Sequence, residues 1–401
     1  MIEAGTSQFW RATMALCIGS FMVFANLYIT HPLLPMLAEE FEISPLLASW
    51  SLTVTTLTLG LSLLVFGPLS DALGRTRLML MTMCGAVLCS FVLSQISDFR
   101  WLLFWRALQG ICLAGLPAIA IAYMGDEFTK KGLIAAVGLY ISGNTLGGIG
   151  GRLIGGFAGE LFGWQEAFAL MTFISFFCLC LFVWLLPPSE NFSARKVVPT
   201  QMMTDAYHHL SNPLLLLAYI VGGLNFFIFI NQYSYATFLL ADEPYYLSAG
   251  VLGLLFLTYL SGTVGAAFSG RIAKNIPQPL VMAMGIIILM AGTLLTLQGS
   301  LWAIILGFLV SAFGFFLAHS CASSWVSHTA LHARATASSI YLLFYYLGAS
   351  SGGFYLDPFW HSWGWDGVVF GSLVVLLITL LSSLMLYYKT SVKLERCAAG
   401  G

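Results

Sequence analysis

The residues best able to do chemistry are charged and polar side chains that stand within long apolar runs. Arg106 and Arg152 come first, because a guanidinium keeps its charge and within such a run normally faces a cavity or a partner. Neutral polar side chains occupy similar runs: Asn26, Tyr28, Asn144, Asn225, Gln232 and His319. These groups could line a cavity that binds a small polar solute, or they could bond one helix to another. Either use fits the sequence.

These side chains belong to a chain that is too apolar for a soluble protein. Of its 401 residues, 59% are hydrophobic and only 8% are charged, whereas about 25% are charged in a typical soluble domain. Twelve helices of about 20 residues need roughly 240 apolar positions, which this composition supplies. A soluble enzyme, a disordered chain and a nucleic-acid-binding protein are excluded, and the long apolar runs disfavour a β-barrel. The fold class is therefore predicted to be an all-α integral membrane protein.

Apolar runs between polar or Pro- and Gly-rich breaks predict twelve membrane-spanning helices. They are expected to begin near residues 11, 46, 77, 101, 133 and 165, and then near 213, 248, 279, 301, 336 and 366. Two six-helix halves, 1–186 and 213–388, are separated by a cytoplasmic linker, 187–212, and followed by a short cytoplasmic tail, 389–401. With both termini in the cytoplasm, only Arg100 of the 16 basic residues lies on the opposite side, while Arg106 and Arg152 fall within spans. This bias predicts that orientation.

A short motif between the second and third predicted spans combines glycines with paired charges. It runs from Gly67 to Arg77 and includes Asp71, Gly74 and Arg75. Gly74 permits a tight turn, and Gly67 is expected to let the end of the second span approach a neighbour closely. Asp71 suits a helix N-terminus, and Arg75 could bind a carboxylate through two hydrogen bonds. The alternative is a solvated loop that follows the positive-inside bias.

This motif and the plan of twelve spans in two halves resemble the major facilitator superfamily. In that family the Asp and Arg of the motif latch the cytoplasmic side in the outward-open state. The resemblance implies a conformational latch that uses Gly67, Asp71, Gly74, Arg75 and Arg77, with Asp126 as the acid at the end of span four. It also implies that two halves rock about a substrate cavity between them.

A second match concerns Arg106, which opens a stretch that resembles the family's R-x-x-Q-G motif. The resemblance implies a role of Arg106 in proton coupling, whereas snorkelling to the outer surface is the structural alternative. Residues 147–152 look like one uncharacterised bacterial branch near the putative drug- and arabinose-efflux permeases. Arg152 is accordingly expected to contact an anionic or polyhydroxylated substrate. Alternatively, both arginines bond to backbone carbonyls or to outer acids such as Asp98 and Glu160.

Glycine recurs at every fourth position of the fifth predicted span. The row includes Gly143, Gly147, Gly151 and Gly155, and the second half repeats part of it as Gly348 and Gly352. Such rows predict close helix packing, with a hinge for rocking as the functional alternative. The row also resembles the glycine-rich fifth span of the family's antiporter branches, although their usual Gly-Pro pair is absent.

The whole sequence predicts a secondary transporter of the bacterial inner (cytoplasmic) membrane. It is expected to export a drug-like or sugar-like small molecule in exchange for protons. The alternatives are a sugar or organic-anion permease or uniporter and, from a different class, an integral membrane transferase. The expected partners are the substrate, protons and the lipid bilayer, with no nucleic acid, no cofactor and no metal, and the chain is expected to be a monomer.

Overall fold

The structure, a computed structural model, describes residues 1–192, 199–330 and 332–399. Residues 193–198 of the predicted linker, with Arg195 and Lys196, and residues 400–401 of the predicted tail lie outside the described residues. The first helices are α1 (Ser7–Tyr28), η1 (His31–Leu33), α2 (Leu34–Glu40), α3 (Pro45–Leu73), α4 (Arg75–Leu93), α5 (Phe99–Leu113), α6 (Gly115–Glu127), α7 (Lys130–Phe162) and α8 (Trp164–Leu185). Then follow α9 (Pro199–Ser211), α10 (Pro213–Ala241), α11 (Ala249–Leu255), η2 (Phe256–Thr258), α12 (Tyr259–Ile272), α13 (Gln278–Leu295), η3 (Thr296–Gln298), α14 (Leu301–Thr329) and α15 (Arg334–Ala399).

The prediction of twelve spans in an all-α membrane protein is confirmed. Eleven stretches of the described residues are long and apolar enough to cross a membrane. The last of them, Arg334–Val392, contains two helices that meet at Trp363 and Gly364, where the backbone is not helical. Several spans consist of two shorter helices in succession, such as α5 with α6, and α11 and η2 with α12.

Local sequence signals explain where the helices begin and end. Ser44 caps α3 by accepting a hydrogen bond from the amide of Leu47, and Asp98 caps α5 in the same way. α3 gives way to α4 at Gly74, whose φ of 98° is open to glycine. α7 gives way to α8 at Gly163 with a φ of 107°. The breaks between spans are therefore encoded by a few capping and glycine residues.

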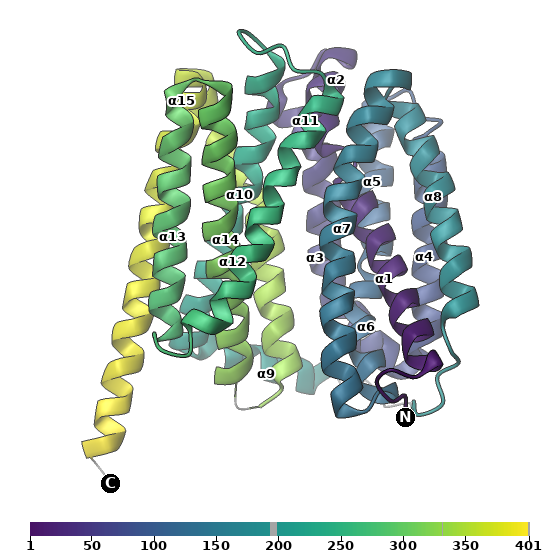
Figure 1. The fold of residues 1–401 in the computed structure, drawn as a ribbon, viewed down its shortest axis with the longest axis vertical. Helices are drawn as coiled ribbons and strands as arrows, with labels where there is room; N and C mark the ends of the chain where they lie inside the picture. The colour runs from purple at the N-terminus through teal and green to yellow at the C-terminus, as the bar shows by residue number, and fades with distance from the viewer. Residues whose placement is uncertain (193–198, 331, 400–401) are drawn as a thin grey trace. The chain divides into compact units, whose positions relative to one another are not determined.

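The chain divides into two compact units. Unit 1 is Met1–Val197 with Leu240–Phe256, and unit 2 is Val198–Leu239 with Leu257–Gly401. In unit 1, α7 runs along α1 (Figure 1), and α11 also packs on α7. α11 thus joins unit 1 although it belongs to the predicted second half of the sequence. The six-helix halves remain a prediction.

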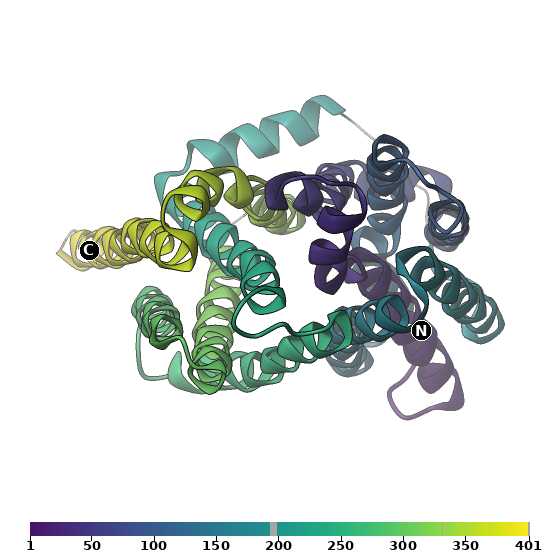
Figure 2. The same ribbon diagram turned by 90° about the horizontal axis from the view of Figure 1, so that it is seen from above.

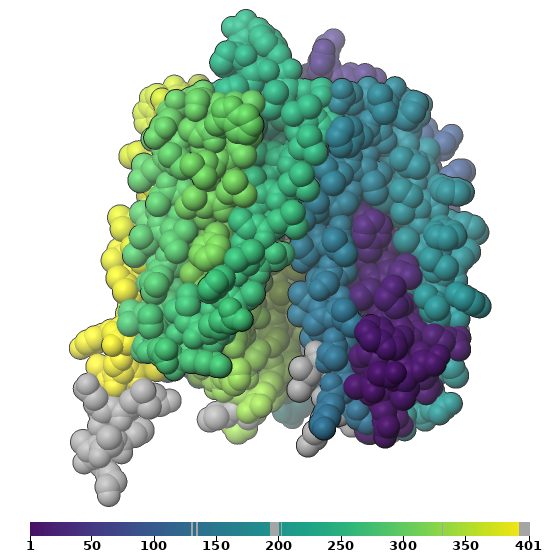
Figure 3. Space-filling model, in the orientation of Figure 1, coloured from purple at the N-terminus to yellow at the C-terminus, as the bar shows by residue number. Residues whose placement is uncertain are grey.

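The surfaces of the spans carry large apolar side chains, as expected for contact with lipid. On α8, for example, Phe173, Phe176 and Phe177 are all exposed. In unit 1 the first residues of α1, with exposed Trp10, lie at the surface beside α7 (Figure 3). In unit 2, α9 lies across the direction of the spans. Figure 2 shows the spans nearly end-on and α9 from the side.

Candidate functional site

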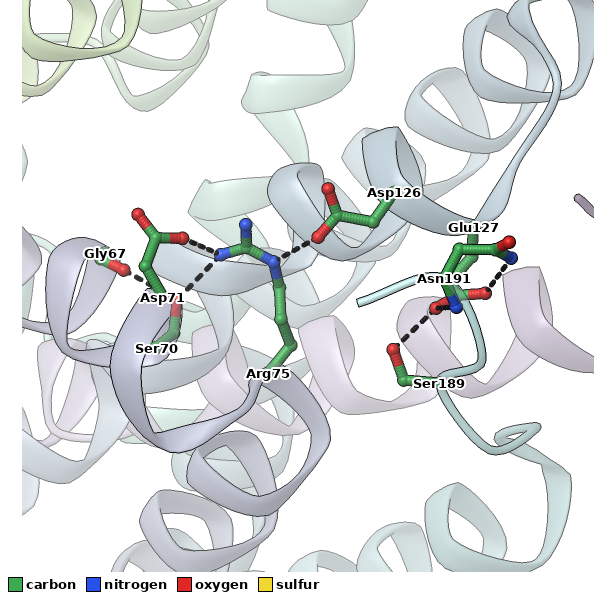
Figure 4. Close-up of polar contacts among 8 residues, drawn as sticks. All are labelled: Gly67, Ser70, Asp71, Arg75, Asp126, Glu127, Ser189 and Asn191. Atoms are coloured by element: carbon green, nitrogen blue, oxygen red, sulfur yellow. Dashed lines mark hydrogen bonds and ion pairs between the residues drawn. The ribbon is translucent and has the colours of Figure 1, made fainter. Parts of the chain in front are cut away.

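The predicted latch residues meet at one end of unit 1 (Figure 4). Arg75 NH1 lies 2.7 Å from Asp71 Oδ1, and Arg75 Nε lies 2.6 Å from Asp126 Oδ2. Arg75 NH1 also donates to Ser70 Oγ at 2.9 Å. The Arg75 side chain is 11% exposed, whereas Asp71 and Asp126 are 39% and 32% exposed. One largely buried guanidinium therefore connects the end of α3 to the end of α6 through two partly exposed carboxylates.

The glycines and Arg77 of the motif differ in what they do. Gly74 forms the expected turn, and the Gly67 carbonyl accepts a hydrogen bond from Ser70 Oγ at 2.6 Å. A Cβ atom at Gly67 would meet no atom within 4 Å. Among the described residues, unit 1 therefore shows no close approach at Gly67, and the expected close packing of this glycine against a neighbour stays a prediction. Arg77 is exposed.

The residue beside Asp126 makes contacts that sequence reasoning missed. Both Glu127 carboxylate oxygens accept from the segment after α8: Ser189 Oγ donates to Oε1 at 2.5 Å, and Asn191 Nδ2 donates to Oε2 at 2.8 Å. Phe192 of the same segment lies under the Arg75 guanidinium, 5.7 Å from Cζ to the ring centroid. The beginning of the predicted linker is therefore attached to the latch end of unit 1. No spacing pattern pointed to this contact.

Arg106 lies fully buried in a polar network of unit 1. Its NH1 and NH2 donate to the carbonyls of Asn26 and Leu27 at 2.9 Å each, and its Nε donates to the Ser51 carbonyl at 2.8 Å. NH1 also donates to Gln109 Oε1 at 2.6 Å. Asn26 and Leu27 belong to the last turn of α1, whose carbonyls lack helical partners and attract positive charge. Arg106 points inward to these groups, so it does not snorkel.

Asn26 is fully occupied within the same network. Its Oδ1 accepts from Ser90 Oγ at 2.6 Å, and its Nδ2 donates to Ser175 Oγ at 2.7 Å. Gln109 Nε2 also approaches Asn26 Oδ1, at 3.2 Å. These contacts support the helix-bonding use of Asn26. Asn144, on α7, accepts a short hydrogen bond from Ser20 of α1.

Arg152 lies between two aromatic rings. Its Cζ is 3.9 Å from the ring centroid of Tyr28 and 4.4 Å from that of Phe256. Its Nε donates to His31 Nδ1 at 3.2 Å, and its NH1 donates to the Gly148 carbonyl at 2.9 Å. Stacking on aromatic faces stabilises a guanidinium that is removed from water. Both buried arginines thus contact the stretch 26–31 at the end of α1.

The glycine row brings α7 into contact with the backbone of α1. A Cβ atom at Gly143 or Gly147 would lie 2.7 and 2.5 Å from the carbonyl oxygens of Cys17 and Phe21. Gly151 and Gly155 meet the carbonyl oxygens of Ala25 and Ile29 still more closely. Contacts at four-residue intervals on both helices are what two closely packed helices require.

Unit 2 repeats this packing with its own glycines. Gly348 and Gly352 of α15 face the carbonyl oxygens of Gly223 and Phe227 of α10. The same two helices also share a side-chain contact, since Asn231 Nδ2 donates to the Ala349 carbonyl at 2.9 Å.

The predicted cavity residues of unit 2 do not form one cluster through their hydrogen bonds. Gln232 Nε2 donates to Thr293 Oγ1 at 3.1 Å. Asn225 Nδ2 donates to the Phe315 carbonyl at 3.4 Å. His319 Nδ1 lies 2.8 Å from Tyr341 Oη, and its ring stacks on that of Phe315.

Comparison with known proteins agrees with this architecture. Residues 16–353 match the family described as Major Facilitator Superfamily. The chain is 37% identical to the "Uncharacterized MFS-type transporter YybF" of Bacillus subtilis (strain 168), over 95% of this chain and 94% of the relative. It is 36% identical to the "Inner membrane transport protein YnfM" of Escherichia coli (strain K12), over 94% and 90%.

A solved structure shares the fold. It is that of a bacterial homologue of the human lysosomal transporter Spinster, with a TM-score of 0.75 at 15% identity and 96% of both chains covered. Its sequence is too distant to say more than that the fold is shared. Together with the twelve spans, the matches show a multi-pass transporter of the bacterial inner membrane rather than an enzyme. The chain belongs to the Major Facilitator Superfamily.

Proposed function

We propose that this transporter exports a small drug-like or sugar-like molecule from the bacterial cytoplasm in exchange for protons. The single observation that supports transport by alternating access is that the Arg75 guanidinium binds both Asp71 and Asp126. A contact between one guanidinium and two partly exposed carboxylates, at the ends of two spans, can form in one conformation and break in another. Both termini lie in the cytoplasm, and the two six-helix halves of a monomer rock about the substrate.

The proposed substrate contacts are Tyr28, Asn144 and Arg152 in unit 1, together with Asn225, Gln232 and His319 in unit 2. Arg152 supports a substrate with acidic or hydroxyl groups, because a guanidinium binds such oxygens through paired hydrogen bonds. The same observation favours a second candidate function, namely an organic-anion or sugar permease that moves no protons. In both cases the substrate would compete with Tyr28 and Phe256 for the guanidinium.

The test is proton movement in proteoliposomes that contain the purified protein and a pH-sensitive dye. Lipophilic cations, sugars and organic acids are added one class at a time. Proton movement with one class supports proton-coupled export and names the substrate class. Uptake of a sugar or an organic acid without proton movement supports the permease and refutes coupling. The double variant Asp71→Asn, Asp126→Asn in the same vesicles serves as the control, because it lacks both carboxylates of the latch.

A further inference from the structure

Proton coupling needs a side chain that gains and loses a proton, and the arginines of this chain cannot do so. Arginine keeps its proton at any physiological pH. Histidine is the side chain whose ordinary titration lies between about pH 5 and 8. Four histidines within the candidate spans of the described residues contact polar groups. His328 and His361 are exposed, whereas His31 of η1 is buried and His319 of α14 is partly buried. The hydrogen-bond partners of His31 and His319 show which of the two imidazoles must be neutral for its contact to exist.

His31 accepts a hydrogen bond that only its neutral form can accept. Arg152 Nε lies 3.2 Å from His31 Nδ1, and both side chains are buried. Arginine has no acceptor atom, so Nδ1 must be without its proton for this contact to exist. A proton on Nδ1 would replace the hydrogen bond with two donors of like charge facing each other. Protonation of His31 and its contact with Arg152 therefore exclude one another.

His319 is not constrained in this way. Its Nδ1 lies 2.8 Å from the hydroxyl of Tyr341. A hydroxyl can donate or accept, so it can rotate to accept a proton from a charged imidazole. Protonation of His319 can thus occur without loss of that contact, and His319 serves as the matched comparison for His31.

His31 lies where three elements meet. Arg152 comes from α7, and the Phe256 ring of η2 lies 4.6 Å from the imidazole and 4.4 Å from Arg152 Cζ. At the other end of α11, Glu160 of α7 accepts from Ser248 Oγ at 2.8 Å and from the Gly250 amide at 2.9 Å. We call this set of contacts, from Arg152–Phe256 to Glu160–Ser248, the α7–α11 clasp.

The clasp is close-packed along its length. A Cβ atom at Gly156 would lie 2.5 Å from the Ala249 carbonyl oxygen, and one at Gly253 would lie 3.0 Å from the Arg152 carbonyl oxygen. In the sequence, α7 belongs to the first predicted half and α11 to the second. In the structure both helices belong to unit 1. Under the proposed rocking of the predicted halves relative to one another, the clasp is formed in one state and parted in the other.

Several ionisable groups of the described residues lie on the elements around His31. Arg152 and Glu160 come from α7, Tyr28 from α1 and Arg106 from α5, whose NH2 approaches neighbouring Thr30. α11 and η2 carry no charged residue. On α2, Glu39 and Glu40 are exposed. Protonation of Glu160 would also weaken the clasp, because its carboxylate accepts from Ser248 and Gly250, so Glu160 is included in the test.

We propose that His31 is the proton-binding residue of the transport cycle, neutral while the α7–α11 clasp is closed and protonated when the clasp opens. The inference rests on the proposed proton coupling and adds the residue and the step. The sign follows from linkage: protons bind the open form, so acid pH favours opening. Each pH unit below the titration point of the free imidazole raises the ratio of open to closed forms by up to about tenfold.

The experiment measures hydrogen–deuterium exchange of residues 241–256 in liposomes between about pH 8 and pH 5, corrected for the intrinsic pH dependence of exchange. The wild type should exchange faster as the pH falls, by about tenfold per unit at most. His31→Asn, whose amide oxygen replaces the accepting Nδ1 but does not titrate, should exchange slowly at every pH. His319→Asn and Glu160→Gln should keep a pH-dependent exchange.

Three results would overturn the proposal. The first is a wild type whose exchange at 241–256 does not depend on pH, which decides the matter even if a variant fails to fold. The second is a His31→Asn protein with the wild-type pH dependence. The third is loss of that dependence in Glu160→Gln alone. The exchange of 241–256 can depend on His31 while no substrate class moves protons in the proteoliposome assay. That result would support the His31 switch and refute proton-coupled export, so the failures of the two proposals are distinguishable.

Discussion

At the scale of single residues, the ion pairs of Arg75 can form and break with little change in the free energy of unfolding. Its two carboxylate partners remain partly exposed, so each ion pair is screened and contributes less than about 1 kcal/mol. A pair that weak can be made and broken within a transport cycle.

We predict that Asp126→Asn shifts the population toward the inward-open form without unfolding the protein. The change removes the charge that holds Arg75 Nε but keeps an oxygen acceptor of the same shape. Labelling of single cysteines placed in the cytoplasmic halves of α3 and α7 should increase. Glu127→Gln is the matched control, because its neighbouring carboxylate binds Ser189 and Asn191 instead of Arg75. Equal labelling in Asp126→Asn and wild type would contradict the latch.

Arg106 acts differently, since it is fully buried and its contacts are mostly backbone carbonyls. We predict that Arg106→Ala lowers the free energy of unfolding by about 3 kcal/mol, because buried acceptors lose a charged donor. The free energy of unfolding of Arg106→Lys should lie between those of the wild type and Arg106→Ala, because lysine keeps the charge but lacks the forked geometry of the guanidinium. Thermal unfolding in detergent measures both. Wild-type stability of Arg106→Ala with loss of proton movement would favour the coupling role implied by the family resemblance.

At the scale of elements, the row of glycines on α7 sets how closely that helix approaches α1. We predict that Gly151→Ala destabilises the protein by about 1–3 kcal/mol, because the added methyl group would overlap the Ala25 carbonyl. Gly138→Ala, in the same helix with no atom within 4 Å, should instead stabilise it by up to about 1 kcal/mol. Denaturation of the two variants side by side provides the comparison. A similar effect of both would mean that the row is not a packing surface.

At the scale of the whole molecule, the distribution of basic residues predicts the orientation in the membrane. Tyr246, in the loop between α10 and α11, and Met203, on α9, are 65% and 74% exposed. We predict that a cysteine at 246 reacts with an impermeant maleimide in intact spheroplasts, while a cysteine at 203 reacts only after permeabilisation. Native cysteines are first replaced in both proteins. The reverse pattern would place both termini outside the cytoplasm.

Much of the fold could be predicted from the sequence, whereas less of the site could. The twelve spans were predicted because each apolar run extends over about 20 neighbouring residues. The meeting of Asp71, Arg75 and Asp126 was also predicted, but only because the motif resembles a known family. His31, Phe256 and Glu127 were missed. A histidine that follows an apolar run does not by itself indicate a functional site. Phe256 is one of 31 phenylalanines in an apolar chain, so nothing in the sequence distinguishes it from the others.

The sequence by itself determined the membrane class, the number of spans and the ends of most helices, because hydropathy, caps and glycine turns act over a few neighbouring residues. Only the tertiary structure decided the partners of the two buried arginines. Arg106 meets carbonyls of α1 and α3, and Arg152 meets His31 and Phe256, which lie more than 100 residues away in either direction. A buried guanidinium binds whatever acceptors and rings the neighbouring helices bring to it, and helix packing alone sets which these are.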